Sequence, residues 1–304
     1  DLFPCTTIGC CFPLTTLLAS LNSSVPITAA ELRPPRAELD AVAGIEAWID
    51  TYHAVRGLTA HNNCVFLTDS AVGQREEHNL RHLITNLGDD APRERVIPFL
   101  TTKHSLDDCF AYADQAWEYG FQSLVVVGGD TTVGPPRCVP RGWKLRQLIR
   151  ARQPDVELGG WANPTKNAAR QVGHLLESHV TADFYLTQVV SHHNLSGVER
   201  FLAESERRGL DLPGVFGVFY YRSGNQRTLD NLARFLPVPR EQLMDEFGSG
   251  ATAEQVCARS IQALRQLGVR HFYISNLPVA QAADILTVIQ NLDNRPVKVD
   301  GQSV

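Results

Sequence analysis

Residues 121–136 read FQSLVVVGGDTTVGPP. The four apolar residues Leu124–Val127 follow one another without polar alternation, which predicts a strand buried on both faces. Gly128 and Gly129 then remove side chains where the strand ends, so that Asp130 is the first side chain beyond it. In a barrel of parallel strands, this C-terminal edge carries the chemistry. The stretch fits equally an ordinary turn in which Asp130 binds the amides of its own loop.

The same pattern of a short apolar strand followed by a helix runs through the chain. Helix-like spacing of apolar residues separates successive strands, as in 36–55, where it predicts a buried stripe. Strands that alternate with helices over such short connections must run parallel. Eight such strands over about 270 residues favour a single closed (β/α)8 TIM barrel over an open sheet. We expect an N-terminal extension over 1–24 and the barrel over 25–304. The predicted strands are 25–32, 64–68, 96–100, 124–127, 156–160, 184–190, 215–220 and 271–275.

Composition narrows the class of partner. The chain has 304 residues, a formal net charge of -5 and no run of Lys or Arg, which gives no reason to expect nucleic acid or an anionic membrane surface. No apolar run is long enough to span a bilayer. The seven cysteines lack metal-like pairing, although Cys5, Cys10 and Cys11 cluster near the start. We therefore expect a small-molecule partner, no metal and a reducing, cytoplasmic setting; a homo-oligomer is compatible with the sequence.

In a barrel, function is predicted from the residues at the C-terminal strand ends. Glu31 ends an apolar strand, where burial would raise its pKa and suit it to general acid catalysis, although a rim carboxylate paired with Arg33 or Arg36 fits as well. Gln188 offers an amide for the edge of a heterocycle, or is simply a satisfied structural side chain. His192 and His193 are interpreted as a surface turn before a helix, with neither catalysis nor metal assigned. The other strand-end side chains are Thr68, Thr101, Asp130, Trp161, Tyr220, Tyr221 and Asn276.

Five of these strand-end segments occur in an order that resembles the methylenetetrahydrofolate reductase family of (β/α)8 barrels. They cover most of the chain after residue 25: AELRPPR at 30–36, PFLT at 98–101, VVGGD at 126–130, LTQ at 186–188 and HFYISN at 271–276. The resemblance implies reduction of 5,10-methylenetetrahydrofolate to 5-methyltetrahydrofolate by NADH or NADPH. By this resemblance Glu31 is the acid, and Asp130 interacts with the pterin and the iminium through a hydrogen bond and its charge. Gln188 would bind the edge of the pterin. Tyr220, Tyr221 and Asn276 would complete the substrate site.

The flavin-binding part of the pattern is altered. Family members hold FAD through residues for which this chain has Phe99, Gly128 and a shortened loop 161–166. The positions left for flavin contact are Thr68, Phe99, Gly129, Trp161 and Lys166. The resemblance therefore leaves open whether the protein holds FAD by different contacts, transfers hydride directly from the nicotinamide, or is a non-catalytic folate- or flavin-binding barrel. A barrel lyase or aldolase ranks last, because no lysine is found at a predicted strand end.

Overall fold

The structure is a computed structural model that describes residues 16–35, 38–69, 83, 85, 91–177 and 179–294. Eight parallel strands close into a barrel in the order of the sequence, because β1 pairs with both β2 and β8. This confirms the predicted fold class, with strand boundaries shifted by up to three residues. The strands are β1 (Thr28–Leu32), β2 (Cys64–Leu67), β3 (Val96–Thr101), β4 (Ser123–Val127), β5 (Glu157–Ala162), β6 (Phe184–Thr187), β7 (Gly214–Phe219) and β8 (His271–Ser275).

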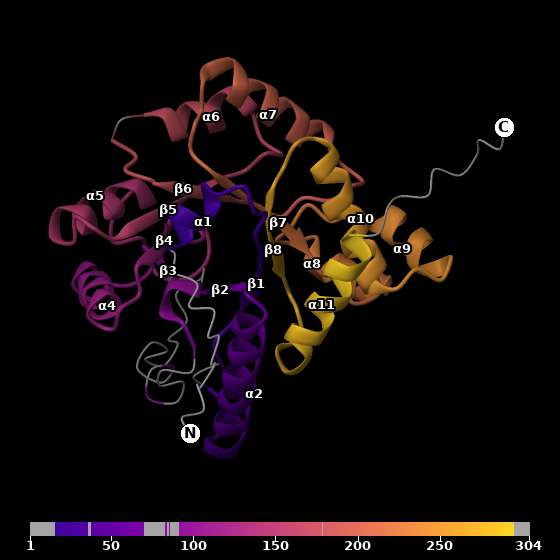
Figure 1. Cartoon of the computed structure of the whole chain (residues 1–304), viewed down its shortest axis with the longest axis horizontal. Coiled ribbons are helices and arrows are strands. Elements are labelled where there is room, and N and C mark those ends of the chain that lie inside the picture. The colour runs from indigo at the N-terminus through magenta and orange to yellow at the C-terminus, as the bar shows by residue number, and fades with distance from the viewer. Residues whose placement is uncertain are drawn as a thin grey trace, which may run out of the picture.

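Helices surround the ring of strands, with α8 and α9 inserted between β7 and α10 (Figure 1). The alternation of strands and helices predicts a helix over 76–87, between β2 and β3, and this stretch lies almost entirely outside the described residues. None of the helices in the described ranges combines the length and the apolar run needed to cross a bilayer. The helices are α1 (Leu17–Leu21), α2 (Ala41–Ala60), α4 (Leu106–Glu118), α5 (Gly142–Arg152), α6 (Ala168–Leu176), α7 (Ser196–Arg208), α8 (Gln226–Leu232), α9 (Arg240–Gly248), α10 (Ala253–Gln266) and α11 (Ala282–Asp293).

The barrel interior is filled by side chains that alternate along the strands. Phe66, Phe99, Phe184 and Tyr273 belong to one buried apolar cluster in the lumen. Phe184 lies against Gly159 of the neighbouring strand, where a Cβ would come within 2.7 Å of its ring. Because the interior is packed rather than hollow, a ligand has access only to the rim of the barrel.

The helix α1, which the sequence did not predict, packs into this same lumen cluster. Leu17 and Leu21 are almost fully buried there. The backbone N–H of Leu18 donates a hydrogen bond of 3.1 Å to the carboxylate of Glu157, the first residue of β5. Since parallel strands all begin at one end of the barrel, α1 covers its N-terminal end.

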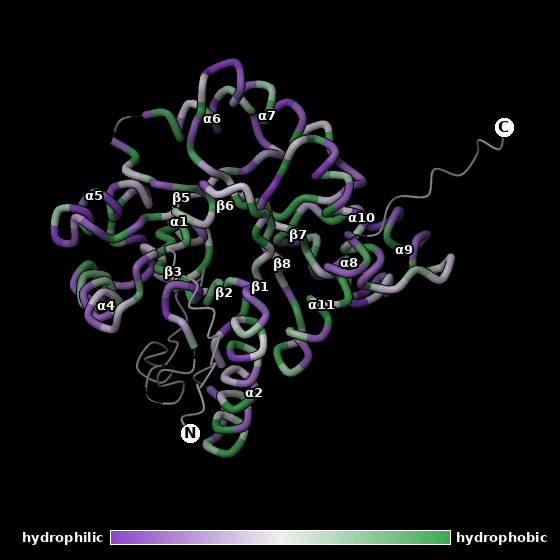
Figure 2. The backbone as a smooth tube through the Cα atoms, in the orientation of Figure 1, coloured by the Kyte–Doolittle hydropathy of each residue, from purple (hydrophilic) through white to green (hydrophobic). Residues whose placement is uncertain are grey.

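The predicted apolar stripe of α2 is mostly wrong. Val42, Ile45 and Ile49 are 68%, 62% and 47% exposed, whereas Trp48 is buried. Figure 2 shows hydrophobic and hydrophilic residues interspersed along the whole helix. The buried residues of α2 all lie from Trp48 onward, because the helix has 20 residues and the strand it covers, β2, has four. Only the C-terminal part of the helix therefore packs on the barrel.

The described cysteines, Cys64, Cys109, Cys138 and Cys257, are free thiols. Cys64 and Cys257 are buried, as their apolar surroundings predict. Cys5, Cys10 and Cys11 lie outside the described residues.

Candidate functional site

A carboxylic acid is located at the C-terminal end of the barrel. Alternation along β1 places Glu31 on the same face as Ala29, which lies in the lumen cluster. The hydroxyl of Ser275, the last residue of β8, donates a hydrogen bond of 2.9 Å to Glu31 Oε1. Burial raises the pKa of Glu31, while this hydrogen bond and the charge of Arg33 oppose the shift. Glu31 lies deep in the protein yet keeps some accessible surface, which suits a group that must deliver a proton to a ligand.

The carboxylate of Glu31 lies near the ring of Tyr273, the residue two positions before Ser275. The Tyr273 hydroxyl donates a hydrogen bond of 2.6 Å to the Thr187 carbonyl on β6. It reaches past β7 because Gly217 has no side chain: a Cβ there would lie 2.5 Å from the phenol oxygen. Burial, and secondly the nearby charge of Glu31, raise the pKa of Tyr273 well above its usual value. The phenol is therefore a neutral donor whose hydrogen bond goes to the Thr187 carbonyl.

Aromatic rings of the lumen lie edge to face next to Tyr273. The ring centroid of Phe66 lies 6.0 Å from that of Tyr273. The ring centroid of Phe66 also lies 5.8 Å from that of Phe99. Phe99, a predicted flavin contact, is 6% exposed and belongs to this packed interior. These rings keep water away from the inner side of the acid, in agreement with its raised pKa.

A carboxylate–imidazole pair, which the sequence analysis missed, lies beyond the ends of β2 and β3. Asp69 accepts hydrogen bonds from the backbone N–H and the hydroxyl of Thr101, at 2.6 and 2.8 Å, and contacts His104 Nε2 at 2.8 Å. The Asp69 side chain is 6% exposed and that of His104 is 29% exposed. The only signal in the sequence is an Asp and a His shortly after consecutive strands. An imidazole held by a buried carboxylate can take up or release a proton at this end of the barrel.

Asp130 is half-buried and is held by its own loop. Its Oδ1 accepts hydrogen bonds from the N–H groups of Thr132 and Val133, at 2.6 and 2.9 Å, and from the Thr132 hydroxyl at 2.8 Å. These bonds, led by the Thr132 N–H, lower the pKa of Asp130. The structure thus shows the loop interaction that the sequence left as an alternative, and a catalytic role for Asp130 stays a prediction.

Two cations, the buried Lys103 and the half-buried Arg137, hold this loop in place. Lys103 Nζ donates hydrogen bonds to the carbonyls of Val133 and Pro135, at 2.6 and 2.8 Å. The guanidinium of Arg137 donates to the carbonyl of Gly129 and lies against Gly128, where a Cβ would be 2.9 Å from its central carbon. The carbonyl of Gly129, a predicted flavin contact, is therefore engaged within the protein.

Two other predicted residues share the lumen face with Glu31. Trp161 alternates with Gly159 along β5 and is 38% exposed at the rim. Gln188 follows β6 directly, and its backbone N–H donates a hydrogen bond of 2.9 Å to the Ala162 carbonyl at the end of β5. The structure thus brings Glu31, Trp161 and Gln188 to one end of the barrel.

The remaining predicted residues have other surroundings. Thr68 donates through its hydroxyl and its N–H to the Leu32 carbonyl, at 3.3 and 2.9 Å, which joins the ends of β1 and β2. Lys166 is exposed beyond β5, in a shallow groove lined by α6 and α7 residues. Of the five predicted flavin contacts, Phe99 is therefore buried in the lumen and Lys166 is exposed, and flavin binding stays a prediction.

The predicted substrate residues after β7 and β8 make mainly structural contacts. The Tyr220 hydroxyl donates a hydrogen bond of 2.5 Å to Glu254 on α10. Tyr221 is buried in a cluster beneath α8 and α9, with its ring 4.8 Å from that of Phe219. Asn276 has a positive φ of 72° and donates through Nδ2 to the Tyr220 carbonyl at 3.0 Å. Their role in substrate binding stays a prediction.

Among known proteins, the chain is similar in fold to solved structures, but it matches no protein by sequence family. No protein-family model and no curated protein matches the chain. An uncharacterized protein from Clostridium thermocellum, described as binding two copies of 5-methyl-5,6,7,8-tetrahydrofolic acid, matches it with a TM-score of 0.64 and 16% identity, over 90% of this chain and 97% of that one. A chain from Aquifex aeolicus VF5 matches with a TM-score of 0.48 and 11% identity, over 88% and 92% of the two chains. At these identities the likeness shows the barrel alone.

Proposed function

We propose that this protein binds a reduced folate at the C-terminal end of its barrel and reduces methylenetetrahydrofolate with NADH or NADPH. The observation that carries the proposal is the Glu31 carboxyl: it has a raised pKa, it is held by Ser275, and it lies at the C-terminal end of a barrel whose interior is filled with apolar side chains. The folate-binding protein of the same fold supports the choice of ligand.

The proposed chemistry begins with a proton. Glu31 gives its proton to the N10 nitrogen of the bound folate, the carbon–nitrogen bond of the five-membered ring breaks, and an iminium remains on the other nitrogen. Hydride from the reduced nicotinamide then adds to the iminium carbon to form the methyl group, leaving the oxidised nucleotide. Solvent returns a proton to Glu31. A carboxyl whose pKa is raised by burial keeps its proton at higher pH, which the first step requires.

The neighbouring residues would hold the pterin. The amide of Gln188 can pair with both donor and acceptor atoms of the pterin edge, and the exposed ring of Trp161 can stack on its face. His104, held by Asp69, is suited to relaying protons at the same end of the barrel.

We derive no step through a flavin. Three of the predicted contacts have surroundings that favour this choice: Phe99 is buried in the lumen, the Gly129 carbonyl is bound by Arg137, and Lys166 is exposed beside α6 and α7. Direct transfer of hydride from the nicotinamide is therefore the form that we propose. An absorbance spectrum of the purified protein tests this choice, because bound flavin absorbs visible light.

The test is oxidation of NADH or NADPH by the purified protein with and without methylenetetrahydrofolate. We expect oxidation that depends on the folate, and turnover lowered by about 10²–10⁴-fold in Glu31→Gln, the usual contribution of a general acid. Glu157→Gln is the matched control, because Glu157 is a carboxylate at the opposite end of the same barrel. Equal turnover in the wild type and Glu31→Gln would refute the role of Glu31.

A second candidate is a barrel that binds folate without reducing it. It is favoured by Asp130, whose carboxylate is occupied by its own loop rather than aimed at a ligand. Calorimetry with tetrahydrofolate separates the two candidates: binding without turnover from either nucleotide identifies a binding protein, and turnover excludes it.

A further inference from the structure

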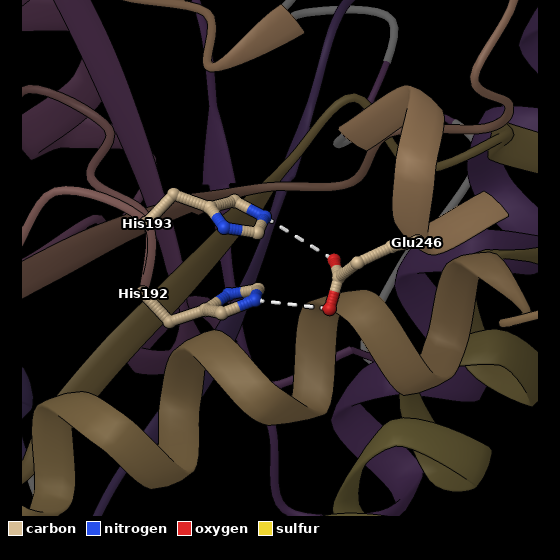
Figure 3. A group of neighbouring side chains, drawn as sticks. All are labelled: His192, His193 and Glu246. Carbon is tan, nitrogen blue, oxygen red and sulfur yellow. Dashed lines mark hydrogen bonds and ion pairs between the residues drawn. The ribbon is translucent and has the colours of Figure 1, made fainter. Parts of the chain in front are cut away.

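Two adjacent histidines and a glutamate converge from the segments that follow β6 and β7. His192 and His193 lie in the loop between β6 and α7, and Glu246 lies on α9. Figure 3 shows both imidazole rings pointing at the Glu246 carboxylate. His192 Nε2 lies 3.2 Å from Oε1 and His193 Nε2 lies 3.2 Å from Oε2. We propose that His192, His193 and Glu246 form a binding site for a divalent transition-metal ion of the zinc type, independently of the folate proposal.

The distances suit a shared metal ion. Zinc binds imidazole nitrogen and carboxylate oxygen at about 2.0–2.1 Å with tetrahedral geometry, so that two ligand atoms are about 3.3 Å apart. Both nitrogen–oxygen separations are close to this value, and all three ligand atoms lie within 4.8 Å of one another. Small side-chain rotations would bring the two nitrogens onto one ion.

The rest of the protein orients one of the ligands. His192 Nδ1 lies 2.8 Å from the hydroxyl of Ser260 on α10. When Nδ1 carries the proton and donates it to Ser260, the lone pair of Nε2 points at Glu246. A hydrogen bond to the second ring nitrogen is the usual support of a histidine that binds a metal.

The cluster is sheltered but not closed. The side chains of His192, His193 and Glu246 are 16%, 12% and 17% exposed. Three protein ligands with an accessible fourth position are the arrangement of zinc sites that keep a bound water. Two histidines and one carboxylate are also ligands typical of zinc and iron, whereas magnesium and calcium bind mainly oxygen ligands.

Arg259 competes with a metal ion for the carboxylate. Its Nη1 lies 2.6 Å from Glu246 Oε1, while its side chain is 48% exposed. Because the guanidinium reaches solvent, it can move away when an ion binds. Removing it should therefore strengthen metal binding, whereas in a cluster that serves only to fasten α9 its removal would have no such effect.

The experiment is titration of the whole protein with Co²⁺, followed by visible absorbance, and competition by Zn²⁺. We expect one ion per chain, with the intense bands of four- or five-coordinate Co²⁺ that added Zn²⁺ removes. His192→Ala and Glu246→Gln should each weaken binding by more than about 100-fold, and Ser260→Ala by about 10–100-fold, as for other residues that orient metal ligands. Arg259→Ala should bind more tightly than the wild type.

The chain supplies a matched control. Glu177 contacts His174 and His179 at 3.4 and 3.0 Å, but all three side chains are more than 40% exposed. Glu177→Gln should leave the affinity and the spectrum unchanged. Absence of stoichiometric Co²⁺ binding by the folded wild type, or equal affinity in the wild type and folded Glu246→Gln, would overturn the proposal and leave the cluster as an ion-pair contact between α9 and the barrel.

Discussion

Gly217→Ala is expected to destabilise the barrel by displacing one buried phenol. The new Cβ would lie 2.5 Å from both the hydroxyl oxygen and the adjoining ring carbon of Tyr273, which is 1% exposed. The ring must therefore move by about 1 Å, and its 2.6 Å hydrogen bond to Thr187 is lost. Overpacking a core costs about 1–3 kcal/mol and a lost hydrogen bond about 0.5–1.5 kcal/mol. We expect the free energy of unfolding to fall by about 2–4 kcal/mol.

Urea denaturation of a double-mutant cycle tests this reasoning. Tyr273→Leu shortens the clashing side chain, so that Gly217→Ala should cost at least about 1 kcal/mol less in its presence than alone, within the usual range of coupling between touching residues. Gly248→Ala is the control, because a Cβ at Gly248 would meet nothing within 4 Å. Additive costs in the cycle, or a cost for Gly217→Ala no larger than that for Gly248→Ala, would refute the proposed contact.

Three further predictions concern the acid, the covered end of the barrel and the missed imidazole. Because Glu31 has a raised pKa when folded, its proton is bound more tightly in the native state. The contribution of Glu31 to wild-type stability should therefore fall as pH rises from the ordinary glutamate value, and Glu31→Gln should gain stability relative to the wild type over that range in urea titrations at several pH values. Leu17→Ala should lower the free energy of unfolding by about 2–5 kcal/mol by leaving a cavity in the lumen, against less than about 1 kcal/mol for the 36%-exposed Leu176→Ala. Asp69→Asn should cost about 2–4 kcal/mol in thermal unfolding, since it weakens charge-assisted hydrogen bonds to Thr101 and His104; an unchanged melting temperature would contradict this.

The elements of the barrel could be predicted from the sequence because each depends on local pattern. An apolar run such as Leu124–Val127 can be buried on both faces only as a central strand, and short helical crossovers require parallel neighbours. The helix α1 escaped prediction because five residues carry too little periodicity, and its burial depends on the lumen cluster that it covers. The prediction of a buried stripe along the whole of α2 was wrong, because periodicity in the sequence does not show how far a helix extends beyond the strand on which it packs.

The sequence by itself determined the order of strands and helices, and with it the end of the barrel at which Glu31, Trp161 and Gln188 lie. Only the tertiary structure decided which groups touch. Glu31 meets Ser275, 244 residues away, because the first and last strands close the barrel, and Glu246 meets His192, 54 residues away, because α9 is inserted after β7. Asp130 instead binds its immediate neighbours, an outcome that local turn chemistry allowed but did not require. Hydrogen bonds between distant residues depend on the fold as a whole, whereas the periodicity that specifies each strand and helix is present in the segment itself.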